Sequence, residues 1–190
     1  FEKDSFDEWS ISQVELPYEQ LASVAENGFA NTLLDSDGYI RHARLTASAG
    51  KEINHSFAYQ IYRKNLEAQG KQSSDYDSIV QFQYSGAPGD YEKVSLVDVL
   101  EGKTDIKAYK NCIIMVGAYA PGMQDAFHVA VDHGEQMYGV EVHANIVDAL
   151  LHGKIVKNVP VMLSVALAAL VLASYAFAAL RQKKLLPVLL

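Results

Sequence analysis

Residues 140–180 read VEVHANIVDALLHGKIVKNVPVMLSVALAALVLASYAFAAL and set the organisation of the chain. The first part, residues 140–151, repeats apolar residues at helical spacing, which predicts a helix that Gly153 ends. The second part, residues 159–180, holds no charged residue. At about 1.5 Å per residue it reaches roughly 33 Å, enough to cross a hydrocarbon core of about 30 Å. We therefore predict a folded domain followed closely by a transmembrane helix.

A buried core helix is the alternative for residues 159–180, but such a helix normally keeps a polar stripe.

The residues that follow the span predict a membrane topology. Residues 181–184 hold three basic side chains, and residues 185–190 are apolar again. By the positive-inside tendency, we expect 181–184 to form a cytoplasmic loop, 185–190 to begin a second transmembrane helix, and residues 1–158 to lie outside. We expect the chain to be part of a longer membrane protein.

The charge of the chain is unevenly distributed. Its 190 residues carry 16 Lys and Arg against 23 Asp and Glu, for a net charge of −7. Residues 159–190 contribute +3, so residues 1–158 carry −7 − 3 = −10. This acidity disfavours a nucleic-acid partner, because binding phosphates needs clustered positive charge. The single cysteine, Cys112, excludes an internal disulfide and a multi-cysteine metal site.

Helices and strands alternate along residues 1–158. The run CIIMVG at 112–117 predicts a strand buried on both faces, with Cys112 as inert packing. Residues 118–138 read as a long irregular loop. The other expected elements are helices at 18–26, from Phe57 to Gly70, at 95–100 and at 140–151, and strands at 39–45 and 78–84. This alternation predicts an α/β domain, with mixed α+β as the alternative, built on a partial central sheet with flanking helices.

Several ordered segments match one known family. They are LP at 16–17, GFAN at 28–31, DSDGYIR at 35–41, YSGAPG at 84–89, VDVLEG at 97–102, VGA at 116–118, Asp125 and GVEVHAN at 139–145. Together they resemble the type 2 CHASE domain, the cyclase/histidine kinase-associated sensory extracellular module of bacterial receptors. The resemblance covers residues 14–158.

The resemblance implies a module outside the cytoplasmic membrane. In that family it usually precedes three spans and a cytoplasmic adenylate or guanylate cyclase, histidine kinase or Ser/Thr kinase. The family module normally begins with further strands and helices upstream, so we expect its N-terminal part to be missing here. The family often has a proline after Asp125, whereas FHVAV at 127–131 has none.

Asp35, Asp37 and Gly38 predict a tight turn. A calcium loop is the alternative, but that loop needs a glutamate at its twelfth position, where this chain has Thr46. Arg41 follows the turn at the base of a strand. We expect it to pair with one of the two aspartates, and binding of an anionic ligand is the alternative.

The potential ligand residues of the second half are Asp125, His128, Asp132, His133, Glu141, His143 and Asn145. Their spacing contains no His-Glu-x-x-His pattern. Three interpretations stay open: a metal or small-ligand site, hydrogen bonds between loop and helix, and a pH sensor at His128 and His133. The ligand-binding candidates are Arg41, Asp125, His128, His133, His143 and Asn145.

The glycines Gly86, Gly89, Gly117 and Gly139 are structural candidates, because their spacing fits neither a phosphate loop nor a dinucleotide fingerprint. No motif of an enzyme is present, so we predict no catalytic residue, no metal and no cofactor. The favoured function is the input domain of a bacterial membrane receptor. It would act as a homodimer at the cytoplasmic membrane and respond to an unknown small molecule or physical stimulus. The alternatives are an assembly module that does not sense a ligand and a metal-dependent periplasmic enzyme.

Overall fold

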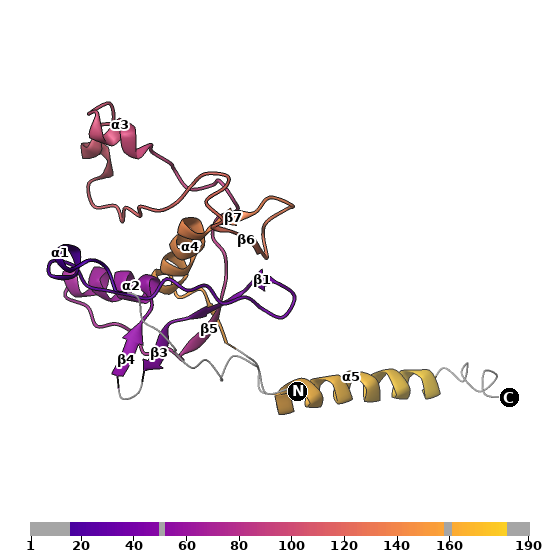
Figure 1. Ribbon diagram of the computed structural model, residues 1–190. Coiled ribbons are helices and arrows are strands. Elements are labelled where there is room, and N and C mark those ends of the chain that lie inside the picture. The colour runs from indigo at the N-terminus through magenta and orange to yellow at the C-terminus, as the bar shows by residue number, and fades with distance from the viewer. Residues whose placement is uncertain (1–15, 50–51, 158–160, 182–190) are drawn as a thin grey trace. The chain divides into compact units, whose positions relative to one another are not determined.

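The computed structural model describes residues 16–49, 52–157 and 161–181. The predicted second transmembrane helix and most of the predicted cytoplasmic loop lie outside these ranges. The chain divides into two compact units, residues 1–156 and residues 157–190. The first unit is a mixed α/β domain with small sheets, and the second contains one long apolar helix, as predicted (Figure 1).

One extended segment, residues 39–49, organises the strands of the domain. It contains β1 (Tyr39–Ile40), β2 (His42–Arg44) and β3 (Thr46–Ala49), which are separated by single residues. Each of the three pairs with a different strand. The partners are β6 (Ala126–Val129), parallel to β1, and β5 (Ile79–Phe82) and β4 (Glu52–His55), antiparallel to β2 and β3. The predicted strand at 39–45 therefore exists as consecutive short strands.

Two very short strands complete the sheets. β7 (Met137–Tyr138) pairs with β6, and β8 (Ile155–Val156) pairs with β5, both antiparallel. The strand orders are β1-β6-β7, β2-β5-β8 and β3-β4. Residues 118–138 were expected to be irregular throughout, and this is wrong for β6 and β7. For β6 a signal was present, because Phe127, Val129 and Val131 alternate along AFHVAV at 126–131, whereas β7 has only two residues and carries no periodic pattern.

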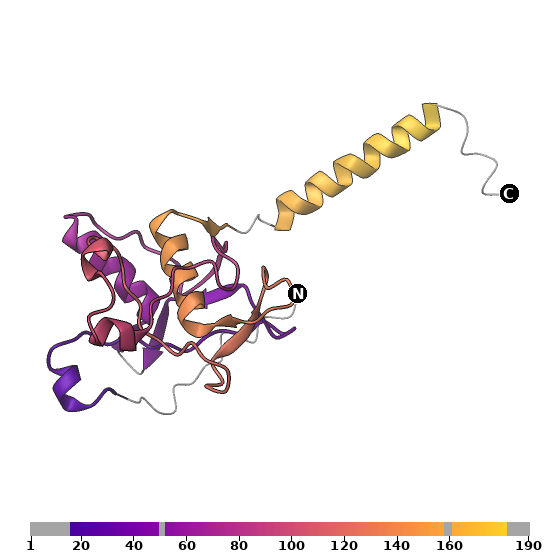
Figure 2. The ribbon, with the colours of Figure 1, turned by 90° about the horizontal axis from the view of Figure 1, so that it is seen from above.

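Two helices supply about half of the core. They are α2 (Phe57–Ala68) and α4 (Gly139–Leu151), which pack against each other and lie side by side in both ribbon views (Figures 1 and 2). Ser56 begins α2 because its hydroxyl accepts a hydrogen bond from the Tyr59 N–H at 3.2 Å. The fully buried side chains include Ile40, Leu45, Val129, Met137, Val142 and Leu150.

The predicted strand at 112–117 is wrong. No strand forms there in the described part of the chain, and Ile114 and Val116 are 67% and 74% exposed. Cys112 is also exposed, so it is not inert core packing. An apolar run becomes a central strand only when neighbouring strands pair with it, and the short strands described above pair elsewhere.

The remaining helices of the domain are short. They are α1 (Glu19–Ala22), shorter than the predicted 18–26, α3 (Leu96–Leu100) and the 3₁₀ helix η2 (Ile106–Tyr109), and none of them contains a buried residue. In the second unit, α5 (Val161–Arg181) is a helix over most of residues 159–180, where we predict a span. Its residues 161–179 have a mean hydropathy of 2.2 and are long and apolar enough to cross a membrane.

Candidate functional site

Three polar side chains of α4 are buried. Glu141 is 3% exposed, His143 9% and Asn145 0%. Glu141 and Asn145 are four residues apart, so they lie one turn apart on the same side of the helix. Polar groups at such depth are expensive unless they are hydrogen-bonded. Their partners therefore show what this face of α4 holds.

Asn145 and Glu141 hold the loop at residues 85–89. The Asn145 Oδ1 accepts hydrogen bonds from the Ser85 N–H at 2.9 Å and the Gly86 N–H at 3.0 Å. The Asn145 Nδ2 donates to the backbone oxygen of Glu141 at 3.0 Å. The Gly89 N–H donates to the Glu141 Oε1 at 3.0 Å. The side chains of α4 thus replace strand partners for the backbone of this loop.

A second group fixes the same loop near the end of α4. The Ser85 hydroxyl contacts the Asp148 carboxylate, and the Lys154 Nζ donates to the Ser85 Oγ at 2.8 Å. The Lys154 Nζ also pairs with Asp148 at 3.3 Å. Burial alone would raise the pKa of Asp148, but the hydrogen bonds from Ser85 and Lys154 leave that pKa below its ordinary value. Lys154 directly precedes β8, so this contact joins the loop, α4 and the last strand.

The start of α4 is closely packed against neighbouring segments of the chain. The Gly139 N–H donates to the Asp125 backbone oxygen at 2.9 Å. A Cβ at Gly139 would lie 2.6 Å from the Asp125 Oδ2, and a Cβ at Gly117 would lie 2.7 Å from the Val140 Cβ. Both positions therefore need glycine, and Asp125 lies against the helix N-terminus, where its negative charge is favoured.

His143 faces the opposite side of the helix start. Its Nε2 lies 3.2 Å from the backbone oxygen of Ala30, and its ring meets the Phe57 ring edge-on at 5.5 Å between centroids. Burial lowers the pKa of His143, although the hydrogen bond to Ala30 and the charge of Asp125 oppose this effect. The imidazole is therefore neutral near pH 7 and donates through Nε2.

A small cavity borders His143. Its volume is about 10 Å³, and Ile40, Ala43, Val142 and Ile146 are among the other lining residues. This volume is close to that of one water molecule. The Nδ1 of His143 is buried and has no hydrogen-bond partner among the described residues. The cavity could satisfy such a group with one water molecule, but it has no room for a metabolite.

Arg41 lies in an ion-pair cluster at the turn. Its NH1 is 3.0 Å from the Asp35 Oδ2 and 2.9 Å from the Asp37 Oδ2, so the expected pairing occurs with both aspartates. The His42 Nδ1 lies 2.7 Å from the other oxygen of Asp35. Hydrogen bonds to Asp37 and Asp35 raise the pKa of Arg41, and the one from Arg41 lowers that of Asp37. The guanidinium is therefore engaged within the protein.

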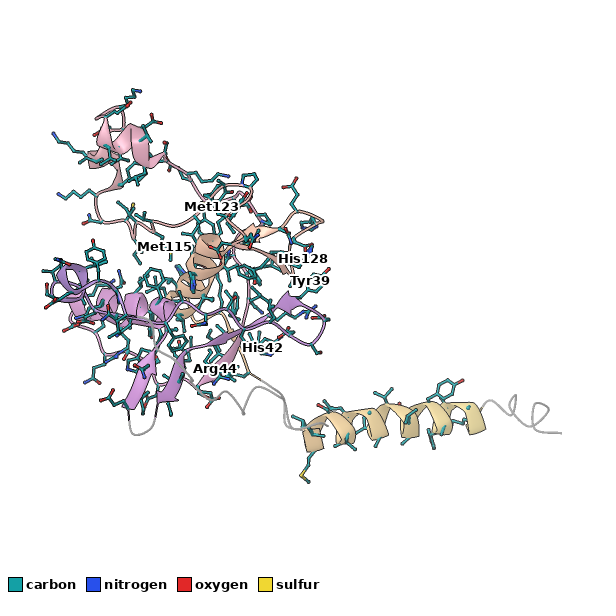
Figure 3. The ribbon with its side chains drawn as sticks, viewed as in Figure 1. Tyr39, His42, Arg44, Met115, Met123 and His128 are labelled. Atoms are coloured by element: carbon teal, nitrogen blue, oxygen red, sulfur yellow. The ribbon has the colours of Figure 1, made fainter. Side chains whose placement is uncertain are left out.

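His128 lies beside this cluster, on the neighbouring strand. Tyr39 and His128 are register partners of β1 and β6, and their rings lie 5.6 Å apart (Figure 3). The His128 Nδ1 is 2.9 Å from the Asp132 Oδ2. A hydrogen bond from the Gly134 N–H, followed by the one to His128, lowers the pKa of Asp132. His133, whose φ is 46°, lies in the turn between Asp132 and Gly134.

The six candidate ligand residues therefore do not form one site. Arg41 and His128 lie at the β1–β6 pair, His133 lies in a turn, and Asp125, His143 and Asn145 surround the first turns of α4. Within residues 16–49, 52–157 and 161–181, no three Asp, Glu, His or Cys side chains gather in a geometry suited to a metal ion. The arrangement holds loops and strands together.

The sequence analysis missed part of this arrangement. It did not single out Ser85, Asp148 or Lys154, and it did not connect Glu141 and Asn145 with the 85–89 loop. A signal was available, because Glu141 and Asn145 are spaced four apart along the same helix face as Val142 and Ile146. Polar residues within an apolar stripe indicate buried hydrogen-bonding groups.

Comparison with known protein families gives one match. The sequence profile described as "CHASE2 domain" matches residues 5–180. The match covers the α/β domain and nearly all of α5. Searches of the curated proteins and of the solved structures found nothing similar.

Proposed function

We propose, on the premise that the chain belongs to the CHASE2 family of extracellular sensory domains, that residues 1–158 are the input module of a bacterial membrane receptor. In this proposal α4 passes a stimulus-dependent shift through β8 to α5. The output is an adenylate or guanylate cyclase, a histidine kinase or a Ser/Thr kinase on the cytoplasmic side. The family supports the sensory role, and the choice among these outputs follows from the resemblance noted in the sequence.

The observation that carries the proposal is the short path from α4 to α5. Only three residues separate the end of α4 at Leu151 from β8, and only four separate Val156 from the start of α5. β8 is not a free linker, because Gln81 and Phe82 of β5 pair with it. Lys154, next to it, binds the Ser85 hydroxyl and Asp148. The connector is therefore short and held by contacts, so a shift of α4 or of the 85–89 loop should reach α5 with little loss.

A stimulus can shift the domain from one arrangement to another only if it favours one of the two arrangements over the other. The α4 face described above offers a place for such a difference, since its polar groups hold the 85–89 loop through a few hydrogen bonds. The stimulus is a small molecule or a physical change outside the cell. The proposal assigns no catalytic step to this chain.

The first test is the side of the membrane on which the domain lies. Cys112 is the single cysteine and is exposed, so a membrane-impermeant maleimide should label it in intact cells. The matched control is the double variant Cys112→Ser, Lys183→Cys, whose thiol follows the span and should react only after the membrane is opened. Labelling of the Lys183→Cys thiol, but not of Cys112, in intact cells would refute the extracytoplasmic placement.

The second test addresses transmission. One to four alanines are inserted after Lys157 in the full-length protein, and the activity of its cytoplasmic domain is measured. We expect the activity to change as residues are added, because each one lengthens the short connector between β8 and α5. The control is the same insertion after Gly102, whose surroundings are open. Equal activity for all insertions at both places would contradict coupling through the connector.

A further inference from the structure

A polar groove lies along the exposed side of α2. Its volume is about 540 Å³, whereas the cavity beside His143 measures about 10 Å³. Small-molecule sites typically have about 300–1,000 Å³, so this groove has room for a metabolite. Its charged lining residues are Glu26, Arg63, Lys64, Glu67 and Lys71, and its other lining residues are polar. Such walls select a ligand that is itself charged and polar.

Three segments of the chain build the groove. One wall is the face of α2 at residues 60–67, and another is the turn at residues 70–73, where the φ of Gly70 is 68°. The third is the segment that contains Asn27, whose backbone oxygen accepts a hydrogen bond from the Gln60 Nε2 at 3.2 Å. The groove therefore follows from the way these segments pack around α2.

The charge of the groove is opposite to that of the domain. Three cations stand against two carboxylates among its lining residues, so the groove carries +1, whereas residues 1–158 carry −10. One cation is already neutralised, because the Lys64 Nζ lies 2.5 Å from the Glu26 Oε1 and 3.2 Å from the Glu67 Oε2. The other two cations therefore decide what this positive site attracts.

Those two cations, Arg63 and Lys71, have no counter-charge. Within the described part of the chain Arg63 makes no ion pair, and the Lys71 Nζ donates to the neutral Gln69 Oε1 at 2.8 Å. A guanidinium presents its N–H groups as a fork that matches a carboxylate or a phosphate. A further part of the domain that covered these cations would have to bring carboxylates of its own, because a buried unpaired charge is very costly. A dissolved anion supplies the same counter-charge.

We propose that this groove binds a small carboxylate that carries several hydroxyl groups, such as a sugar acid. The carboxylate pairs with Arg63 and Lys71, and the hydroxyl groups form hydrogen bonds with the polar wall residues Gln60, Gln72 and Ser73. Because α2 packs against α4, the ligand binds to a helix that contacts the one leading to the membrane span. The inference deepens the proposed function and rests on it for one claim, that the bound anion is the stimulus.

A monoanion suits the groove better than a phosphate monoester. One negative charge cancels the +1 of the lining residues, but a phosphate monoester carries about two negative charges at pH 7. The second charge would be repelled by Glu26 and Glu67, which line the same groove. Inorganic phosphate is therefore the competing ligand in the test.

The test is the binding of radiolabelled glucuronate to the full-length protein in mild detergent, measured by equilibrium dialysis. The full-length protein includes whatever part of the domain precedes this chain, so a groove that such a part covers would not bind. We expect a Kd below about 1 mM. Glucose carries similar hydroxyl groups without the carboxylate, so it should bind at least about tenfold more weakly.

Variants of the groove show whether the anion binds there. Arg63→Gln removes the guanidinium and should weaken glucuronate binding at least about tenfold. Arg63→Lys keeps the charge without the fork, so it should weaken binding by less than Arg63→Gln does. The control is Lys110→Gln, which removes an exposed lysine outside the groove and should leave the Kd unchanged.

A gain of affinity excludes a simple loss of folding. Glu67→Gln removes a repelling carboxylate and releases Lys64 from one of its two partners, so we expect binding to tighten about threefold. The inference would be overturned by no glucuronate binding up to about 10 mM, by a Kd that Arg63→Gln does not change, or by tighter binding of inorganic phosphate than of glucuronate. None of these results touches the proposed function, which the labelling and insertion experiments test separately.

Discussion

The loop at residues 85–89 and the segment at residues 94–116 are neighbours in the sequence, yet they are held in opposite ways. The loop has little apolar surface, and its backbone is fixed by Asn145 and Glu141. The segment is rich in apolar residues, and none of them is buried within the chain. The difference shows that apolar content alone does not place a segment. Specific partners for its backbone and side chains do.

The largest expected effect compares one leucine in each region. Leu150 in α4 is 2% exposed, and Leu100 in the segment is 77% exposed. Leu150→Ala removes buried methyl groups and leaves a cavity, so we expect the free energy of unfolding to fall by about 3 kcal/mol. Leu100→Ala should change it by less than about 0.5 kcal/mol in the monomer. Urea unfolding in mild detergent, followed by circular dichroism, measures both. Equal losses would remove the contrast between the two regions.

The next comparison concerns the amide that holds the loop. Asn145→Ala leaves the Ser85 and Gly86 N–H groups without their acceptor, so we expect a loss of about 2–3 kcal/mol in unfolding free energy. Asn111→Gly is the control in the segment. Its φ of 66° suits glycine, so that change should be nearly neutral. A neutral Asn145→Ala would mean that the loop is held by other contacts.

The next prediction concerns the pH dependence of stability. Residues 94–116 contain no histidine, so any histidine-linked pH dependence comes from the rest of the chain. Burial lowers the pKa of both His143 and His55 in the folded domain. The unfolded chain therefore binds more protons, and stability is lost as the pH falls below about 6.5, by at most about 1.4 kcal/mol per pH unit for the buried His143 and by less for His55, which is partly exposed to solvent. Urea unfolding at pH 5 to 8 measures this slope. His143→Gln should reduce it, and His133→Asn, at an exposed turn position, serves as the control. An unchanged slope in His143→Gln would contradict the assignment.

The smallest comparison is between two serines that precede helices. The Ser56 hydroxyl caps α2, whereas Ser95 precedes α3 and makes no side-chain capping hydrogen bond. Ser56→Ala should reduce the free energy of unfolding by about 1 kcal/mol, and Ser95→Ala by no more than a few tenths of that. Thermal unfolding of the two variants side by side decides this. A larger loss at Ser95 would show that α3 is tied to the domain after all.

The sequence predicted the elements whose signals are local. The Asp35–Gly38 turn, the helices that begin near Phe57 and Val140, and the apolar span at 159–180 all follow from caps, turn residues or unbroken hydrophobicity. The strand predicted at 112–117 failed because a run of apolar residues says nothing about whether partner strands exist. β7 and β8 were missed because two-residue strands carry no periodic pattern at all.

The contacts of the candidate site also divide into those that a local sequence pattern predicts and those that it does not. Arg41 and its aspartates are four and six residues apart, so their pairing could be expected from the turn itself. Asn145 was expected to bind a ligand or to join a loop to its helix. The 85–89 loop that it holds lies about 60 residues away in the sequence, and no local pattern identifies such a partner. Glu141 and Asp148 reach the same loop across similar separations.

The extended segment at residues 39–49 has a consequence for how the domain opens. Its three short strands lie on one backbone, and each belongs to a different small sheet. All strands of these sheets are only two to four residues long, shorter than is usual in globular proteins, so we do not expect any of the sheets to be stable alone in water. Pulling any one of them apart displaces the shared backbone and loosens the other two. The three sheets should therefore open together as a single cooperative unit, because they share residues 39–49. We expect their amide hydrogens to exchange with one common protection factor.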